Sequence, residues 1–234
     1  MKLNTILLLA LCSCPAVATE RYSGANHIQF QHSEKPFVGS GFLLQHGQQV
    51  YAVTAKHVLF ETMDQGIDHI NIDGQVTQWQ LKPFNEDTGV VTLGKLLNAN
   101  PAEALDMAVL ADDWLLFAVK ENHSRLQPLR LADEAPQAGD ELVTHGCTYQ
   151  SQATCHQDRF KGHFVRMEGD NLLLKLNDAE PGTLRGLSGA PVLNAAGEVV
   201  GIVSNVLPDP DGGHYFAPFG TGPLKSFLLD ESTK

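Results

Sequence analysis

Short apolar runs separated by turn residues constrain the fold of this chain more than any other feature. Runs of four to eight β-branched or apolar residues have the length of strands, and such runs at close spacing are typical of antiparallel sheets. The turns between them include 46–48 and 194–197, while helical periodicity is confined to Leu224–Leu229 and one turn from His57 to Met63. The sequence therefore predicts an all-β fold with a short C-terminal helix. The predicted strands are Phe37–Leu44, Gln49–Thr54, Val90–Leu93, Met107–Leu110, Glu141–Thr144, Leu172–Leu176, Pro191–Leu193 and Glu198–Val203.

A polar stretch within 119–129 predicts a boundary between two halves of the chain. Closing a sheet on itself removes its exposed edges, so each half is expected to form an antiparallel β-barrel. We place the N-terminal barrel at 19–119 and the C-terminal barrel at 120–234. A site built from both halves would lie in the cleft between the barrels.

The first eighteen residues have the pattern of an export signal. Lys2 precedes the apolar segment Ile6–Leu11, and Ala16–Ala18 reads as an A-x-A cleavage site. This apolar segment is shorter than the roughly 20 residues that a membrane span requires. We expect cleavage after Ala18 and a periplasmic or secreted protein, with a lipid anchor on Cys14 as the lesser alternative.

The charge of the chain bears on its partners. Loss of Lys2 with the signal changes the formal net charge from −11 to −12. Nucleic acids and anionic lipids are bound through clusters of Lys and Arg, so neither is expected as a partner.

The cysteines left after cleavage form an even pair. Cys147 and Cys155 in an exported chain are expected to form a disulfide. A metal site that used both with His145 and His156 would lack the paired spacing of zinc ligands, so no metal is expected. The other histidines, including His27, His32, His69, His123 and His163, show no paired spacing and are expected at the surface.

A serine in a glycine turn indicates the chemistry of the chain. A serine hydroxyl is a weak nucleophile until a base removes its proton. Ser188 lies in the turn Gly186–Pro191, His57 follows the apolar run 50–55, and Asp106 precedes another apolar run. The order His, Asp, Ser is that of chymotrypsin and differs from the orders in subtilisin and the α/β-hydrolases. Each residue alone would be a turn, a structural histidine or a cap, but together they predict an activated nucleophile.

Five segments in this order resemble the trypsin/chymotrypsin-like serine peptidase family. The resemblance extends over about 36–229, and no single segment would suffice for it. The segments are Gly39–Leu43, Thr54–Val58, Leu105–Val109, Gly186–Pro191 and Val200–Ser204.

The resemblance implies an enzyme that hydrolyses polypeptides through an acyl-enzyme. It implies six-stranded barrels, a triad of His57, Asp106 and Ser188, and an oxyanion hole from the backbone N–H groups of Gly186 and Ser188. Ser204 would help to hold Asp106. No cofactor is implied, and we assume a monomer.

The resemblance also gives a substrate pocket, formed by Gly182, Thr183, Ser204, Asn205, Val206 and Gly213. Gly182 stands where trypsins have an aspartate, which disfavours Arg or Lys as the residue before the cleaved bond (P1). Val206 stands where a glycine is usual and would narrow the pocket, and the pocket histidine of glutamyl endopeptidases would fall at Val203. We therefore expect a small or apolar P1 residue.

Leu187 departs from the family at a position that matters for activation. Digestive relatives have an aspartate there, which pairs with a new N-terminus after cleavage of a zymogen. A leucine makes no such ion pair, so the mature chain is expected to be active without this step.

Two other functions are compatible with parts of the sequence. The chain could be a non-catalytic binding module on the same fold. It could also be an α/β-hydrolase esterase, since 186–190 nearly matches G-x-S-x-G, but alternating helices and parallel strands are missing.

Overall fold

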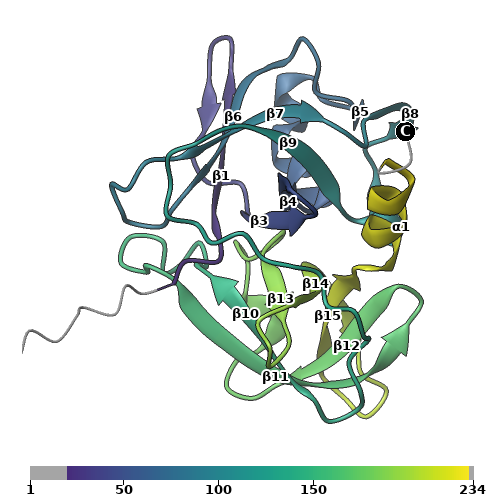
Figure 1. Ribbon diagram of the computed structural model, residues 1–234. Helices are drawn as coiled ribbons and strands as arrows, with labels where there is room; N and C mark the ends of the chain where they lie inside the picture. The colour runs from purple at the N-terminus through teal and green to yellow at the C-terminus, as the bar shows by residue number, and fades with distance from the viewer. Residues whose placement is uncertain (1–19, 232–234) are drawn as a thin grey trace, which may run out of the picture.

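The computed structural model describes residues 20–231, which form two antiparallel β-barrels packed against each other (Figure 1). The predicted signal, with Cys12 and Cys14, lies outside the described residues. No helix in the described range is long and apolar enough to cross a membrane.

The first barrel is a closed ring of six strands. The ring follows the order β1-β3-β4-β9-β7-β6 and closes through the pairing of β6 with β1, while the short β2 extends it beside β1. A separate two-stranded sheet joins β5 to β8. The bounds are β1 Gly24–Phe30, β2 Glu34–Lys35, β3 Ser40–His46, β4 Gln49–Thr54, β5 His69–Ile70, β6 Val76–Lys82, β7 Val91–Leu96, β8 Asn100–Ala104 and β9 Leu115–Asn122.

The second barrel is also closed, in the order β10-β11-β12-β15-β14-β13. The last strand of the first barrel continues to Asn122, across the expected boundary at 119/120, and the next strand starts at Glu141. The bounds are β10 Glu141–Gly146, β11 Asp158–Glu168, β12 Asn171–Leu176, β13 Pro191–Leu193, β14 Val199–Pro208 and β15 His214–Gly220.

The helical elements are short: three 3₁₀ helices lie between strands, and one α-helix follows the last strand. The 3₁₀ helix η1 (Lys56–Gln65) follows β4, η2 (Met107–Asp112) precedes β9, and η3 (Pro181–Thr183) lies between β12 and β13. The helix α1 (Gly222–Glu231) confirms the predicted C-terminal helix. It leaves the second barrel and packs against the first, where Phe227 lies edge-on to Trp114 with ring centroids 5.4 Å apart.

One predicted strand is wrong. Met107–Leu110 forms η2 instead, because the Asp106 side chain accepts a hydrogen bond from the backbone N–H of Ala108 at 2.8 Å and caps this helix. Val109 is buried, but Met107 is 69% exposed, so the apolar run does not enter the sheet.

Candidate active site

Ser188 lies in a turn between η3 and β13, at the seam of the two barrels. Gly186 and Gly189 flank it with φ angles of +106° and +87°. A Cβ at Gly189 would lie 2.2 Å from the Ser40 carbonyl oxygen, so the turn requires a glycine there. The Ser188 carbonyl accepts a hydrogen bond from the Ser40 N–H at 2.7 Å.

His57 reaches Ser188 from the other barrel. It is the second residue of η1, shortly after the end of β4 at Thr54, and its Nε2 lies 2.7 Å from the Ser188 Oγ. The predicted pairing of these two residues, 131 positions apart, is therefore present in the structure.

The acid beside His57 is Asp113, and the expectation of Asp106 was wrong. Asp113 Oδ2 lies 2.6 Å from His57 Nδ1, and Asp113 Oδ1 accepts a hydrogen bond from the His57 N–H at 2.9 Å. The Asp113 side chain is fully buried, and the Ser204 hydroxyl also donates to it. Ser204 was expected to hold Asp106 but holds Asp113 instead, while Asp106 caps η2.

A buried lysine sits next to this pair in the sequence. Lys56 is 2% exposed, and its Nζ lies 2.8 Å from Glu103 and 2.9 Å from Asp112. Adjacent residues Lys56 and His57 therefore contact adjacent acids Asp112 and Asp113. This double contact fixes η1 against the segment that precedes β9.

Two backbone N–H groups near the serine are available to a ligand. In the part of the chain that the structure describes, neither Gly186 nor Ser188 donates its N–H to a protein acceptor. Unpaired N–H groups beside a nucleophile are the donors that a tetrahedral oxyanion requires.

A pocket of about 370 Å³ opens beside Ser188. Four predicted residues line it: Gly182, Ser204, Asn205 and Val206. The others that line it are Pro181, Leu184, Arg185, Val203 and Phe216.

Two predicted pocket residues lie elsewhere. Thr183 is exposed at the end of η3, where its hydroxyl donates to the Glu180 carbonyl at 2.7 Å. Gly213 lies in the turn between β14 and β15, with a φ of +85°. Phe216, which pairs with Val206 across the two strands, lines the pocket and was not predicted to do so.

Cys147 and Cys155 form the predicted disulfide, with their Cα atoms 5.8 Å apart. Their thiols are therefore not free to bind a metal. Among the described residues, no group of three or more His, Cys, Asp or Glu side chains is arranged around a common point.

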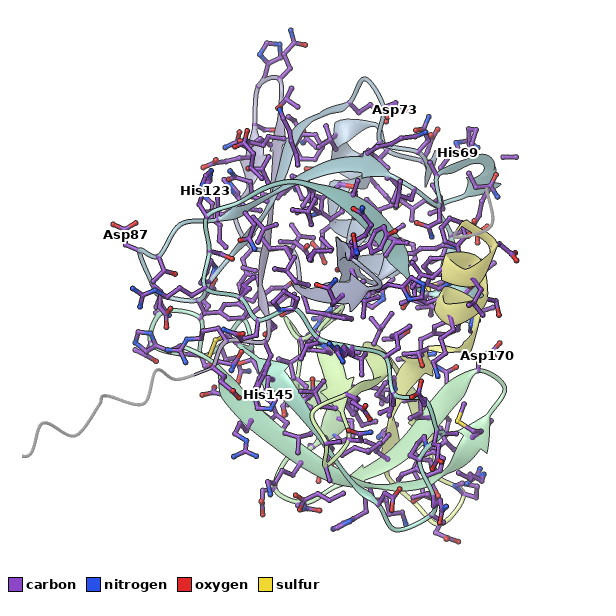
Figure 2. All side chains as sticks on the ribbon, viewed as in Figure 1. His69, Asp73, Asp87, His123, His145 and Asp170 are labelled. Atoms are coloured by element: carbon purple, nitrogen blue, oxygen red, sulfur yellow. A yellow bond between two sulfur atoms is a disulfide. The ribbon has the colours of Figure 1, made fainter. Side chains whose placement is uncertain are left out.

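Among the described residues, none of the remaining histidines lines the pocket beside Ser188. Figure 2 shows His69 and His123 at the outer surface of the first barrel. His27 was expected at the surface, but it is 3% exposed, and its Nε2 lies 2.9 Å from the Glu34 carboxylate.

Sequence reasoning missed Asp113 and Phe216. Asp113 precedes Trp114–Val119, an apolar run longer than the one after Asp106, and this length was the available signal. Phe216 carried no local signal, because its place in the pocket depends on the register of β15 with β14.

Two closed antiparallel barrels with a serine, a histidine and an aspartate joined at their seam define the class of serine-type endopeptidases. The family model of the trypsin-like peptidase domain matches residues 39–202. The chain belongs to this family.

Solved structures with a similar fold include two proteases. The Rv3671c protease from M. tuberculosis, in its active form, is 15% identical with a TM-score of 0.58, over 90% of this chain and 81% of that one. A Glu endopeptidase in complex with MPD is 12% identical with a TM-score of 0.58, over 94% of this chain and 100% of that one. At these identities the likeness concerns the fold alone. Among curated proteins, none matches.

Proposed function

We propose that this protein is an exported serine endopeptidase that cleaves polypeptides through an acyl-enzyme formed on Ser188. The observation that carries this proposal is the continuous chain of hydrogen bonds from Ser188 Oγ through His57 to Asp113, with distances of 2.7 Å and 2.6 Å. Asp113 takes the role that the sequence suggested for Asp106.

The chemistry follows from these contacts. His57 Nε2 removes the hydroxyl proton as Ser188 Oγ attacks the scissile carbonyl carbon, and the same proton then passes to the leaving amine. Asp113 accepts the N–H of His57 Nδ1, which leaves Nε2 unprotonated and stabilises the imidazolium once it forms. Water then repeats the sequence on the acyl-enzyme and releases the acid product.

The negative oxygen of the tetrahedral intermediate needs donors that are already in place. The N–H groups of Gly186 and Ser188 are suited to this role, because no protein acceptor in the described range competes for them. The loss of one such donor typically costs about 2.7–4 kcal/mol of transition-state stabilisation.

The pocket beside Ser188 is proposed to take a small or apolar P1 side chain. Val206 and Phe216, which are paired across β14 and β15, both line it, and Gly182 supplies no charge to it. Arg185 is the charged residue that lines it, which disfavours the cations Arg and Lys as P1 residues.

Export is supported by the covalent chemistry of the chain. Disulfides persist in oxidising compartments and are rare in the cytosol. The Cys147–Cys155 bond therefore agrees with the signal-like segment at 1–18.

A fluorophosphonate probe tests the proposed nucleophile. We expect it to label the wild-type protein at Ser188 and to leave Ser188→Ala unlabelled. Folded wild-type protein that binds a peptide but is not labelled would instead favour a binding module. Profiling with a peptide library tests the pocket, and cleavage dominated by Arg, Lys or Glu at P1 would contradict the proposed selectivity.

A further inference from the structure

The peptide bond between Arg185 and Gly186 decides where the Gly186 N–H points. In a trans peptide the C=O and N–H groups point in opposite directions, and no described peptide is cis. The Arg185 carbonyl accepts a hydrogen bond from the Tyr149 N–H at 2.9 Å. This bond turns the Gly186 N–H away from Tyr149, and rotation of the peptide would break it.

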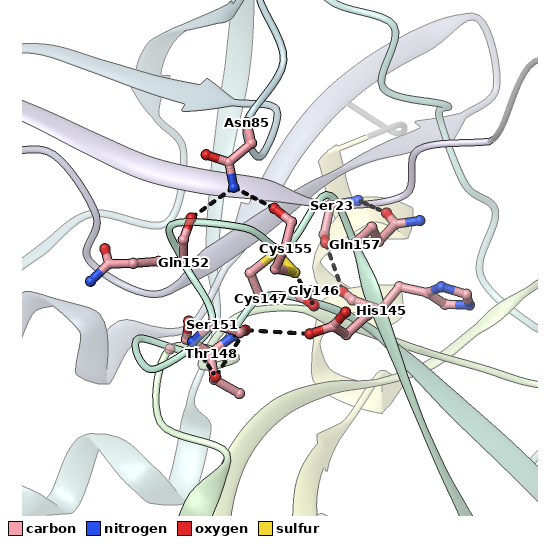
Figure 3. Close-up of a disulfide and its surroundings, with 12 residues drawn as sticks. Ser23, Asn85, His145, Gly146, Cys147, Thr148, Ser151, Gln152, Cys155 and Gln157 are labelled. Carbon is pink, nitrogen blue, oxygen red and sulfur yellow. Dashed lines mark hydrogen bonds between the residues drawn. A yellow bond between two sulfur atoms is a disulfide. The ribbon is translucent and has the colours of Figure 1, made fainter.

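Tyr149 lies in a loop that the disulfide closes. The loop runs from Cys147 to Cys155, and Figure 3 shows it around the buried sulfur atoms. Within it, the Cys155 N–H donates to the Ser151 carbonyl at 2.9 Å, and the Ser151 N–H donates to the Thr148 carbonyl at 3.2 Å. The disulfide and these backbone hydrogen bonds therefore restrict the backbone of the loop that contains Tyr149.

The first barrel holds the same loop from outside. Asn85 Nδ2 donates to the carbonyls of Gln152 at 2.7 Å and Cys155 at 2.5 Å (Figure 3). The two cysteines also pack in a small apolar cluster with Phe84 of the first barrel. The loop, which connects β10 to β11 of the second barrel, is thus held by residues of the first barrel.

Tyr149 makes a second hydrogen bond, through its side chain. Its hydroxyl accepts the N–H of Gly39 at 3.1 Å. Gly39 packs closely against the serine turn, since a Cβ on Gly39 would lie 2.6 Å from the Ser188 carbonyl oxygen. Tyr149 therefore contacts two backbone segments near Ser188: Arg185 directly before the serine turn and Gly39 of the first barrel.

Leu187, the residue before Ser188, holds the serine turn by apolar packing and not by an ion pair. The Leu187 side chain is fully buried among apolar residues, and a Cβ at Gly146 would lie 2.8 Å from its Cδ2. Gly146 directly precedes Cys147, so Leu187 packs on the base of the disulfide loop. The loop and the nucleophile turn are coupled by packing as well as by the Tyr149 hydrogen bonds.

We propose that the Cys147–Cys155 loop holds the oxyanion hole open, with Tyr149 as its positioning residue. The disulfide and Asn85 fix the loop, Tyr149 fixes the Arg185 carbonyl, and the Gly186 N–H is thereby left directed at the reacting oxygen. The inference rests on the proposed peptidase function, and it identifies the part of the fold that keeps the oxyanion hole in place.

Three variants test the loop, each by a different contact. Cys147→Ala with Cys155→Ala removes the covalent closure, and Tyr149→Phe removes the hydroxyl contact to Gly39. Asn85→Asp replaces a donor with an acceptor at a φ of 49°, a conformation that both Asn and Asp tolerate. Gln150→Ala is the matched control, because Gln150 is an exposed residue of the same loop.

The readouts are kcat and KM on a peptide anilide and the Ki of a peptidyl aldehyde, whose adduct carries an oxyanion. We expect the cysteine pair to lower kcat by about 10- to 100-fold, a part of the effect of losing a whole donor. KM should stay within about threefold of wild type, because the loss concerns the transition state. The aldehyde Ki should rise in parallel with the fall in kcat, with smaller changes for Tyr149→Phe and Asn85→Asp and none for Gln150→Ala.

Folded variants with wild-type kcat and wild-type aldehyde Ki would overturn this inference and leave the proposed function intact. Wild-type protein that neither cleaves peptides nor reacts with a fluorophosphonate would overturn the proposed function itself, and the inference with it. If the cysteine variant does not fold by circular dichroism, Asn85→Asp and Tyr149→Phe decide, since both keep the disulfide.

Discussion

Two aspartates seven positions apart in sequence have different roles because of what surrounds each side chain. Asp113 is fully buried and accepts hydrogen bonds from the His57 backbone, the His57 ring and Ser204. Asp106 accepts from the backbone at the start of η2. Three donors around one buried carboxylate hold it in a single orientation, whereas a helix cap can be exchanged for another cap.

A matched pair of variants separates these roles. Asp113→Asn should lower kcat by about 10⁴-fold, the effect known for the corresponding change in a Ser-His-Asp triad, where the amide favours the wrong histidine tautomer. Asp106→Asn should leave kcat within about twofold of wild type, because asparagine also caps helices well. Steady-state kinetics on one peptide anilide measure both. A larger loss of kcat in Asp106→Asn than in Asp113→Asn would show that Asp106 is the acid of the triad.

At the scale of the elements, strands were predicted best from the sequence where their local composition is apolar and turn residues bound them. The hairpin of β3 and β4 and the strands β10 and β12 to β14 follow apolar runs with turn residues between them. β1 was missed because Asn26 and His27 interrupt its apolar pattern, although both are buried. Asn26 is tolerated there because its amide donates to the carbonyls of Val38 and Ser40 and to Thr54.

Local sequence also predicted only a part of the candidate active site. Ser188 and His57 stand in short motifs that the sequence shows directly. The acid could not be chosen by its motif, because both aspartates precede apolar runs, and one run forms a 3₁₀ helix while the other forms β9. Likewise Phe216 enters the pocket through strand register, which depends on contacts distant in sequence.

The hairpin of β14 and β15 carries a prediction about selectivity. Val206 is 37% exposed at the pocket and faces Phe216 on the paired strand. Val206→Gly should widen the pocket and raise kcat/KM for Phe or Tyr at P1 by about 10-fold or more, the range for added volume in an apolar pocket. Cleavage after Ala should change little.

Leu207→Ala is the control, because the next residue of a strand points to the opposite face. The comparison is made with peptide anilides that differ at P1 alone. An unchanged ratio of Phe to Ala cleavage in Val206→Gly would show that Val206 does not limit the pocket.

At the scale of the whole molecule, both ends of the described chain cross between the barrels. Near the N-terminus, the Ser23 hydroxyl donates to the His145 carbonyl of β10 at 2.6 Å, and the Tyr22 N–H donates to Gln157 at 2.7 Å. At the C-terminus, α1 returns to the first barrel. The largest core cluster joins this helix, residues of β13 to β15 and the first barrel, as the buried positions of Leu193, Phe219 and Leu224 show.

A shared core predicts that the two barrels unfold together, although the chain exceeds the roughly 150 residues below which single domains usually behave as two-state. Trp79 and Trp114, the two tryptophans of the chain, both belong to the first barrel or its edge, so their fluorescence follows that barrel. Far-UV circular dichroism follows both barrels. With the disulfide intact, the urea transitions by the two methods should coincide.

Leu228→Ala tests the coupling through α1. Leu228 is 1% exposed, and its truncation should cost about 2–5 kcal/mol of unfolding free energy, as for other buried leucines. Leu229→Ala changes a neighbour that is 62% exposed and should cost within about 0.5 kcal/mol. Because α1 follows the second barrel in sequence and packs on the first, Leu228→Ala should move both urea transitions by the same amount. A fluorescence transition that moves while the main dichroism transition stays in place would mean that the barrels unfold independently.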